Sequence, residues 1–397
     1  MPHDRERSRS NVRPLLWFPI ILVMVAFAAP SATAEAPAAG EGSGRTSDAD
    51  RESVNPSEPD EPPRWSSAGP AGHAPLGVMG DHTHGAGEWM LAYSYSRHVQ
   101  NQLREGASRV SVDEVYEDFP MVPLDMTMGM HMGHVMYAPT DRVTLMAMAM
   151  WMQHRMDTRM ADSFHGDHDD HSDHDDHDGH GHGPHHVHPH SVSGLSDAEF
   201  SSLVTLWDRN RRRVHLNLGV GIPVGSITAS EPAMHGEGEE RLSYPMQLGS
   251  GSWEARPGIT LLQQTRWLSL GAQATGVFRL NESGAGYRRG PALSATGWAQ
   301  LRGNAWVAPG VRLAHTRRSN ISGADPALDP ALSPENDPNR QGGARLRAYA
   351  SLNFQVPRGP LAGHRLAVEW GRPVWESLDG PQLGGGFHVA LGWEYAL

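Results

Sequence analysis

The sequence predicts an all-β protein: a transmembrane, antiparallel, up-and-down β-barrel of about 12 strands with long extracellular loops. Three observations predict this fold. From residue 88 onward, segments recur in which large apolar residues alternate with small or polar ones, a period of two that is typical of strands with one apolar face. The connectors between them alternate between short and long. After residue 30, no run of 18 apolar residues is present that could form a spanning helix.

The N-terminal part precedes the predicted barrel and carries an export signal. Four arginines in the first 13 residues, an apolar stretch over residues 15–29 and the small residues 32–34 follow the order of a secretory signal peptide. We predict a signal peptide over residues 1–34, with an uncleaved membrane anchor as the alternative. Residues 35–78 are rich in Ala, Gly, Ser, Pro and Glu, and we expect a flexible periplasmic leader there. The barrel is predicted over residues 79–397.

The C-terminal segment gives the clearest strand pattern. Large apolar side chains occupy every second position from Phe387 to Leu397, and small or polar residues lie between them. A soluble protein would have to cover this apolar face with a second layer, whereas a closed barrel in lipid would not. The segment is therefore expected to be the closing strand of a barrel. An edge strand of a soluble β-sandwich is the alternative.

The same pattern predicts the other strands. Twelve segments qualify in total, at residues 89–96, 127–138, 142–154, 200–208, 214–222, 256–264, 268–280, 291–302, 305–316, 345–356, 365–370 and 387–397. An even number of strands puts both ends of the mature chain on the periplasmic side of a Gram-negative outer membrane. Charged residues of both signs lie on the polar faces, and buried charges must be paired or hydrated. The lumen is therefore expected to be either a narrow polar passage or a cross-linked interior.

The connectors sort by length in the way that outer-membrane barrels require. Short turns are predicted around residues 139–141, 209–210, 265 and 303–304, with a modest connector at 357–363. Long connectors are predicted at residues 99–126, 155–199, 225–255, 281–290, 317–342 and 374–384. Short periplasmic turns and long extracellular loops are typical of this class.

Composition excludes several classes of function. The chain has no cysteine, which removes disulfides, thiolate metal sites and cysteine nucleophiles. A net charge of −12 disfavours nucleic acid as a partner. The sequence contains no zinc-hydrolase or phosphate-binding motif. Gly249-Ser250-Gly251-Ser252 lacks the strand-to-helix context of a nucleophile elbow, so we expect no enzymatic activity and no required cofactor.

A His/Asp-rich stretch at residues 161–195 is the most unusual part of the chain, and we expect it to be an extracellular loop. Imidazole is mostly neutral near pH 7 and leaves a ring nitrogen free to coordinate, while carboxylates attract cations. Such a stretch should bind Zn, Cu or Ni ions at several interchangeable sites. The alternative is a solvated acidic loop. The candidate ligands are His165, Asp167, His168, Asp170, His171, Asp173, His174, His177, His180, His182, His185, His186, His188 and His190.

The predicted hairpin before this loop is rich in methionine. In each of its strands every second residue is a thioether or an imidazole, and Ala147, Ala149 and Trp151 form the better lipid face of the second strand. The methionines of that strand are therefore expected to point inward. Facing thioethers suit a soft cation such as Cu(I) or Ag(I); the alternative is that methionine is a flexible apolar filler. The candidate residues are Met148, Met150, Met152, His154, His131 and His134, together with His82 and His84 before the first strand.

Several motifs resemble one family. Met79-Gly80-Asp81-His82-Thr83-His84, Tyr137-Ala138-Pro139-Thr140-Asp141-Arg142 and Tyr244-Pro245-Met246-Gln247-Leu248 are similar to motifs of the bacterial outer-membrane "transporter" barrels associated with the meta-pathway of phenol degradation. The resemblance covers residues 79–397. It implies a barrel and supports transport. The His/Asp insertion and the terminal Leu397, in place of an aromatic residue, depart from the family pattern.

These observations predict an outer-membrane, transporter-like channel linked to the binding or handling of copper or zinc. Two alternatives stay open: a channel for small aromatic or hydrophobic compounds, and a metal-sequestering surface protein whose barrel is only an anchor. The expected partners are outer-membrane lipid, the barrel-assembly machinery, and metal ions or small-molecule solutes.

Overall fold

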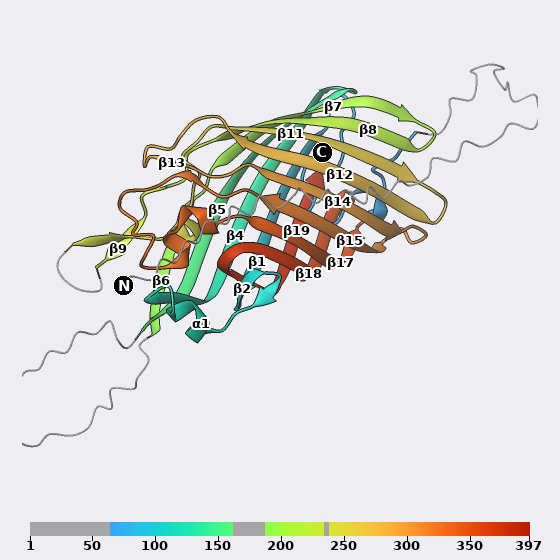
Figure 1. The fold of residues 1–397 in the computed structure, drawn as a ribbon. Helices are drawn as coiled ribbons and strands as arrows, with labels where there is room; N and C mark the ends of the chain where they lie inside the picture. The colour runs from blue at the N-terminus through green and yellow to red at the C-terminus, as the bar shows by residue number, and fades with distance from the viewer. Residues whose placement is uncertain (1–63, 162–186, 234–237) are drawn as a thin grey trace, which may run out of the picture. The chain divides into compact units, whose positions relative to one another are not determined.

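Twelve antiparallel strands form a closed ring, which confirms the predicted fold class (Figure 1). The computed structural model describes residues 64–161, 187–233 and 238–397, and all of them belong to one unit, Glu61–Leu397. The strands of the ring are β1 (Trp89–Gln100), β4 (Met121–Thr140), β5 (Val143–Met160), β7 (Ala198–Arg209), β8 (Arg212–Ile222), β11 (Glu254–Gln264), β12 (Leu268–Arg279), β14 (Ala292–Leu301), β15 (Val307–Arg318), β17 (Gly343–Gln355), β18 (His364–Gly384) and β19 (Phe387–Ala396).

The C-terminal strand closes the ring. Each strand pairs with its neighbours in the sequence, and β19 pairs with both β18 and β1, where Leu91 lies opposite Tyr395. Closure leaves the ring without a free edge whose backbone groups would have to be satisfied inside a bilayer. The interpretation of the final segment as the closing strand is confirmed.

The alternation of side chains separates an apolar outer face from a polar interior. Leu313 and Trp370 are about half exposed on the outside, whereas Arg312 and Glu369, their neighbours in the sequence, are 5% and 0% exposed. Inside the ring, carboxylates and guanidinium groups are paired, as in Arg312–Glu369 and Arg279–Glu254. Of the two alternatives for the lumen, these pairs are the cross-links of the second. No helix among the described residues is long and apolar enough to cross a membrane.

Short turns gather at one end of the barrel. The turn between β7 and β8 consists of Asn210 and Arg211, both with positive φ, as the twist of a two-residue hairpin requires. At the opposite end lie the long connectors, with α1, β9 and β13 (Figure 1). Their elements are β2 (Gln102–Gly106), β3 (Ser108–Arg109), α1 (Val112–Tyr116), β6 (Val187–Leu195), β9 (Ser230–Pro232), β10 (Glu239–Arg241), η3 (Tyr244–Met246), β13 (Tyr287–Arg288), β16 (Ser322–Gly323), η4 (Pro334–Asn336) and η5 (Pro338–Arg340).

The predicted long loops contain strand, and at two places it lengthens the sheet of the ring. The connector expected at residues 374–384 is the second half of β18, which pairs with β17 and then with β2. The true connection to β19 is the pair Gly385–Gly386, both with positive φ. Within the expected loop at residues 161–195, residues 187–195 form β6 and pair with the end of β5. The backbone hydrogen bonds come from β5 for β6, and from β17 and then β2 for the end of β18.

The long connectors pack on one another and form a loop cap. Its apolar cluster joins residues that are far apart in the sequence, including Val115 of α1, Met156 of β5, Met246 of η3 and Leu383 of β18. A smaller cluster contains Tyr244, Tyr287 and Leu328. Such clusters between loops stabilise this end of the barrel through burial of apolar surface.

An inserted segment, residues 65–87, occupies the lumen near the short turns. The leader was expected to stay flexible to residue 78, but Trp65, Ala74 and Val78 are buried against Leu262 and Trp298. The barrel wall also binds the backbone of this segment: Asn353 donates to the carbonyl groups of residues 70, 73 and 74, and Arg365 donates to that of Gly69. These hydrogen bonds order a stretch that has no apolar periodicity of its own. η1 (Pro70–Gly72) lies within it.

Candidate functional site

Methionine side chains line the inner face of β4 and β5. In β5 the even-numbered residues from Met146 to Met160 are buried or half-buried, while most of the odd-numbered ones are exposed. The pairing register places the two strands' inward residues directly opposite each other, which forms cross-strand pairs. From the loop cap toward the short turns these pairs are Met121–Met160, Met126–Met156, Met128–His154, Met130–Met152, Met132–Met150, His134–Met148 and Met136–Met146.

This paired row places most of the hairpin residues predicted as ligands in the lumen. Met148, Met150, Met152, His154 and His134 all belong to the row, as the lipid face predicted for the second strand requires. His131 does not join it. Its Nδ1 atom lies 2.7 Å from the hydroxyl oxygen of Tyr93 at an exposed position, because odd-numbered residues of β1 and of β4 after its register shift at Pro123–Asp125 face outward.

At its outer end, the row reaches the part of the His/Asp-rich stretch that the structure describes. His190 lies opposite Met156, and its ring contacts the hydroxyl group of Thr158 at 2.8 Å and the carboxylate of Glu231. His188, which belongs to β6 like His190, lies opposite Thr158 of β5. The other predicted ligands of this stretch, from His165 to His186, lie outside the described residues.

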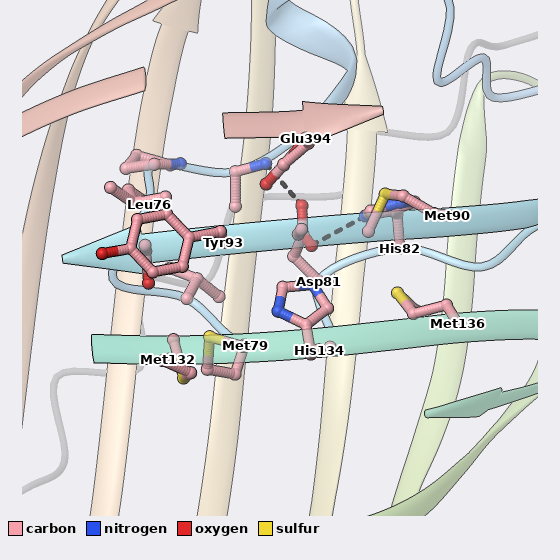
Figure 2. Close-up of a pocket in the computed structure, with 16 residues that line it drawn as sticks. Leu76, Met79, Asp81, His82, Met90, Tyr93, Met132, His134, Met136 and Glu394 are labelled. Carbon is pink, nitrogen blue, oxygen red and sulfur yellow. Dashed lines mark hydrogen bonds and ion pairs between the residues drawn. The ribbon is translucent and has the colours of Figure 1, made fainter. Parts of the chain in front are cut away.

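At its inner end, the row meets the inserted segment. The cavity there is lined by Met79, Asp81 and His82 of the inserted segment, by Met90 of β1 and by inward residues of β4, among them Met132, His134 and Met136 (Figure 2). Glu394 of β19 lines the same cavity. Thioethers and imidazoles from three different parts of the chain therefore lie around one small space.

The segment Asp81–His84 is held against the barrel wall through Thr83 and through the backbone of His84. The Thr83 hydroxyl group contacts that of Thr205 at 3.1 Å, and the Arg213 guanidinium donates to the Thr83 carbonyl group at 3.0 Å. The backbone N–H of His84 donates to the hydroxyl group of Thr144 at 3.0 Å. Because Thr83 is anchored to the wall, His82 and His84 are directed to the other side together.

The two imidazoles face each other through the same ring nitrogen. The Nε2 atoms of His82 and His84 are 3.2 Å apart. The Nδ1 atom of His82 lies 2.7 Å from the Asp81 carboxylate, and that of His84 lies 3.3 Å from the Glu88 carboxylate. Both histidines are buried, at 1% and 6% exposure. Each ring therefore has a carboxylate behind it and the other ring in front of it.

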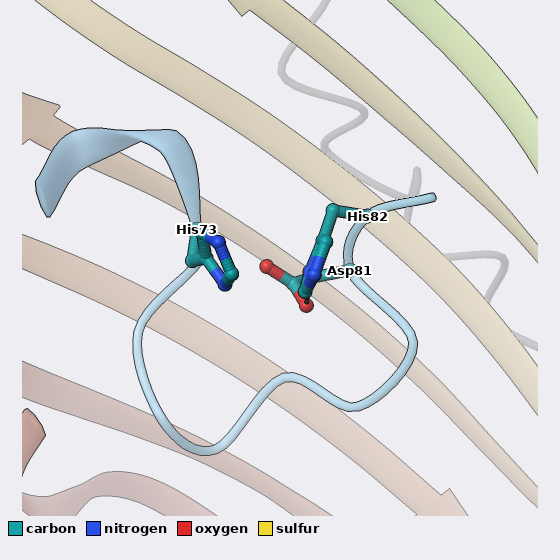
Figure 3. Close-up of side chains that lie close together, drawn as sticks. All are labelled: His73, Asp81 and His82. Carbon is teal, nitrogen blue, oxygen red and sulfur yellow. Dashed lines mark hydrogen bonds and ion pairs between the residues drawn. The ribbon is translucent and has the colours of Figure 1, made fainter. Parts of the chain in front are cut away.

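His73 adds a third imidazole to this cluster. Its ring centroid lies 3.9 Å from that of His82, and ligand atoms of His73, Asp81 and His82 lie within 4.8 Å of one another (Figure 3). Its Nδ1 atom is 3.2 Å from a carboxylate oxygen of Glu394. Neither of these two atoms makes a hydrogen bond of good geometry within the described structure, and nor does Nδ1 of His134. Several buried polar atoms of this cluster can therefore accept a further polar partner.

The ionisable groups of the inserted segment have pKa values that are shifted in different directions. Burial, with a smaller contribution from the neighbouring His82, lowers the pKa of His84 to about 3. Burial by itself would raise the pKa of Asp81 and lower that of His82. Their mutual attraction and hydrogen bond outweigh burial, so the pKa of Asp81 is lowered and that of His82 is raised. His84 is thus a neutral imidazole with a free electron pair at neutral pH.

The sequence indicated only part of this cluster. His82, His84 and His134 were among the predicted ligands, and the structure brings all three to the same end of the lumen. His73, Asp81 and Glu394 were not among the predicted ligands. His73 belongs to a stretch with leader-like composition, and Glu394 comes from the last strand, so only the folded barrel brings them to His82. The spacing of two between His82 and His84 was the available signal.

Comparisons with known proteins support the barrel class. No protein-family model matches the sequence, and no curated protein matches it. Among solved structures, the COG4313 outer membrane channel from Pseudomonas putida F1 aligns with 81% of this chain and 100% of its own, with a TM-score of 0.52 and 11% identity. A Pseudomonas aeruginosa FadL homologue aligns with 84% and 98%, with a TM-score of 0.42 and 11% identity.

At this level of identity, the likeness to the first of these channels establishes the fold. The chain has the architecture of an outer-membrane β-barrel. The family named from the sequence motifs stays a prediction.

Proposed function

We propose that the protein is an outer-membrane channel for transition-metal cations, with the paired row of β4 and β5 as the path that selects them. The observation that supports this most directly is the position of that row. Its seven pairs extend along the lumen from the loop cap to the cavity lined by His82 and His134. Thioether sulfur prefers soft cations such as Cu(I) and Ag(I) over the hard cations Na⁺ and Mg²⁺.

Packing accounts for part of the row, because Met126 and Met156 belong to one apolar cluster and Met136 and Met146 to another. It does not account for the methionines between them. An apolar filler serves equally well on either face of a strand, yet in β5 every methionine points inward and alanine or tryptophan points outward. Much of the rest of the lumen is lined by ion pairs and hydrogen-bonding residues such as Gln273, Asn353 and Glu369. One stripe of the wall therefore differs in chemistry from the remainder, as selective passage of a soft ion requires.

A barrel that serves only as an anchor for metal-binding loops is the second candidate. It is favoured by the inserted segment, whose residues Trp65, Ala74 and Val78 are buried within the ring. The two candidates differ in one measurable property, since only a channel passes ions.

Ion flux into lipid vesicles that contain the purified protein tests both candidates. We expect Ag⁺ or Cu⁺ to enter faster than in protein-free vesicles. The combined change Met130→Leu, Met132→Leu, Met150→Leu and Met152→Leu should slow that entry, because leucine keeps the side-chain volume but lacks the sulfur. Met246→Leu, in the loop cap, is the matched control and should leave the flux unchanged.

Entry of Na⁺ through the same vesicles is the internal control. If the fourfold variant slows Na⁺ and Ag⁺ equally, the row shapes the pore without selecting the ion. Absence of flux for every ion tested would favour the anchor.

A further inference from the structure

We infer that His82 and His84 form a metal site in the inserted segment that holds a d¹⁰ cation, Zn²⁺ or Cu⁺, through their Nε2 atoms. The inference rests on the proposed function and deepens it, because it assigns the place where the thioether path ends in imidazole ligands. It also differs from the expected binding by the His/Asp-rich stretch, whose described residues His188 and His190 lie at the other end of the row.

The separation of the two nitrogen atoms fits a shared tetrahedral ion. Nitrogen ligands of zinc lie about 2.0–2.1 Å from the ion, so two of them on a tetrahedron are about 3.3–3.4 Å apart. The Nε2 atoms of His82 and His84 are 3.2 Å apart. A linear two-coordinate ion would need a separation of about 4 Å at the same bond length, so the geometry favours tetrahedral coordination.

The carboxylates behind the rings supply a second argument. Histidines that bind metal usually donate the other ring N–H to a carboxylate or carbonyl group, which fixes the tautomer and the ring orientation. Asp81 lies at Nδ1 of His82 and Glu88 lies at Nδ1 of His84. With Nδ1 protonated in both rings, both Nε2 atoms carry an electron pair at a separation of 3.2 Å. Two electron pairs at this distance repel, and a cation bound by both removes the repulsion.

Other groups that can bind metal lie near His82. His73 has a ligand atom within 4.8 Å of those of Asp81 and His82, and its Nδ1 atom has the carboxylate of Glu394 beside it. That group of three does not include His84, so the two Nε2 atoms alone define the site. The thioether of Met90 lines the same cavity as His82, and imidazole and thioether are both suitable ligands for Zn²⁺ or Cu⁺.

The rival explanation is a shared proton, in which a protonated His82 donates to the neutral His84. Both explanations satisfy the facing nitrogen atoms, but only the metal site retains an ion. Metal binding would also release that proton. Retention of metal by the purified protein therefore separates the two.

The test uses the full-length protein in detergent, stripped of metal and then loaded with Zn²⁺ in one arm and with Cu⁺ under reducing conditions in the other. A competing chelator removes weakly bound ions, and elemental mass spectrometry counts the remainder. We expect the wild type to retain one equivalent more than His82→Gln/His84→Gln in at least one arm. His131→Gln, which changes a histidine on the outer face, is the matched control and should behave as the wild type.

A second variant tests the geometry without removing a ligand. Glu88→Gln keeps both imidazoles and weakens the hydrogen bond behind His84, so the metal affinity should fall by about 10–100-fold. Anomalous diffraction at the metal absorption edge should place the retained ion between His82 and His84. Heat-modifiable migration on gels verifies that each variant still forms a folded barrel.

Equal retention by the wild type and the double variant, or an anomalous peak only elsewhere, would overturn the assignment. That failure is distinct from failure of the proposed function. A protein with selective Ag⁺ flux but no retained equivalent would keep the thioether path and lose this site. Retention without flux would keep the site in an anchor.

Discussion

At the scale of single residues, Arg312 and Glu369 form the most deeply buried ion pair inside the ring. Both side chains are at most 5% exposed, and the Arg312 guanidinium also stacks on the ring of Tyr349. Loss of one partner leaves an uncompensated charge. We therefore expect Glu369→Gln to lower the free energy of unfolding by about 3–5 kcal/mol, measured by urea unfolding in lipid vesicles.

An exposed ion pair of the same chain provides the control. Arg155 and Asp157 lie 3.5 Å apart with 64% and 24% exposure, and Arg155→Gln should change the same quantity by only about 0–1 kcal/mol. Replacement of both buried partners by Met and Leu should cost less than the single change, because no charge is left unpaired. If Glu369→Gln is as mild as Arg155→Gln, the lumen at this level is well hydrated.

At the scale of elements, the loop cap contains a buried acid. Burial raises the pKa of Glu335 in η4 from 4.5 to about 8, while its hydrogen bond with the Ser333 hydroxyl group acts in the opposite direction. The folded cap therefore holds this proton more tightly than the unfolded chain does. The stabilisation is fully present below pH 4.5 and is lost as the pH rises to about 8.

Hydrogen exchange of residues 328–342, corrected for the intrinsic effect of pH, should therefore show less protection at pH 8 than at pH 5. Glu335→Gln cannot ionise and should abolish that difference. Glu282→Gln, at an exposed position in the β12–β14 connector, should leave it unchanged. A pH-dependent loss of protection that persists in Glu335→Gln would assign the effect to another group.

Strands and loop elements differ in how far the sequence predicts them. The ring strands were predictable because lipid on one side and a polar lumen on the other impose an alternation of period two on every strand. The loop elements were not, since α1, β2 and the end of β18 depend on contacts between distant connectors. The inserted segment was missed for the same reason: Asn353 and Arg365, almost 300 residues away, hold its backbone.

One part of the candidate site was predictable from the sequence. The β5 methionines were expected to point inward because Ala147, Ala149 and Trp151, on the opposite face of the strand, suit the lipid. The register that pairs them with β4 also needs the turn geometry at Thr140–Val143, where the pairing is irregular. His131 was included because it lies in a His- and Met-rich stretch, but its odd number places it outside. Strand parity was a better guide there than composition.

At the scale of the whole molecule, three layers are arranged along one axis: the loop cap, the paired row and the inserted segment. Each contributes histidine, thioether or carboxylate groups to a line that extends from His190 through Met150 to His82. Passage of ions through the barrel requires that this line of side chains face a space that ions can reach.

Because the chain has no cysteine, single cysteines can be placed on either face of β5, and their reactivity in lipid vesicles tests this claim most directly. We expect Met150→Cys and Met152→Cys to react with a small charged thiol reagent, and Ag⁺ to protect them. Ala147→Cys and Ala149→Cys should react only with a lipid-soluble reagent. Charged labelling at positions 147 and 149, with none at positions 150 and 152, would contradict the account.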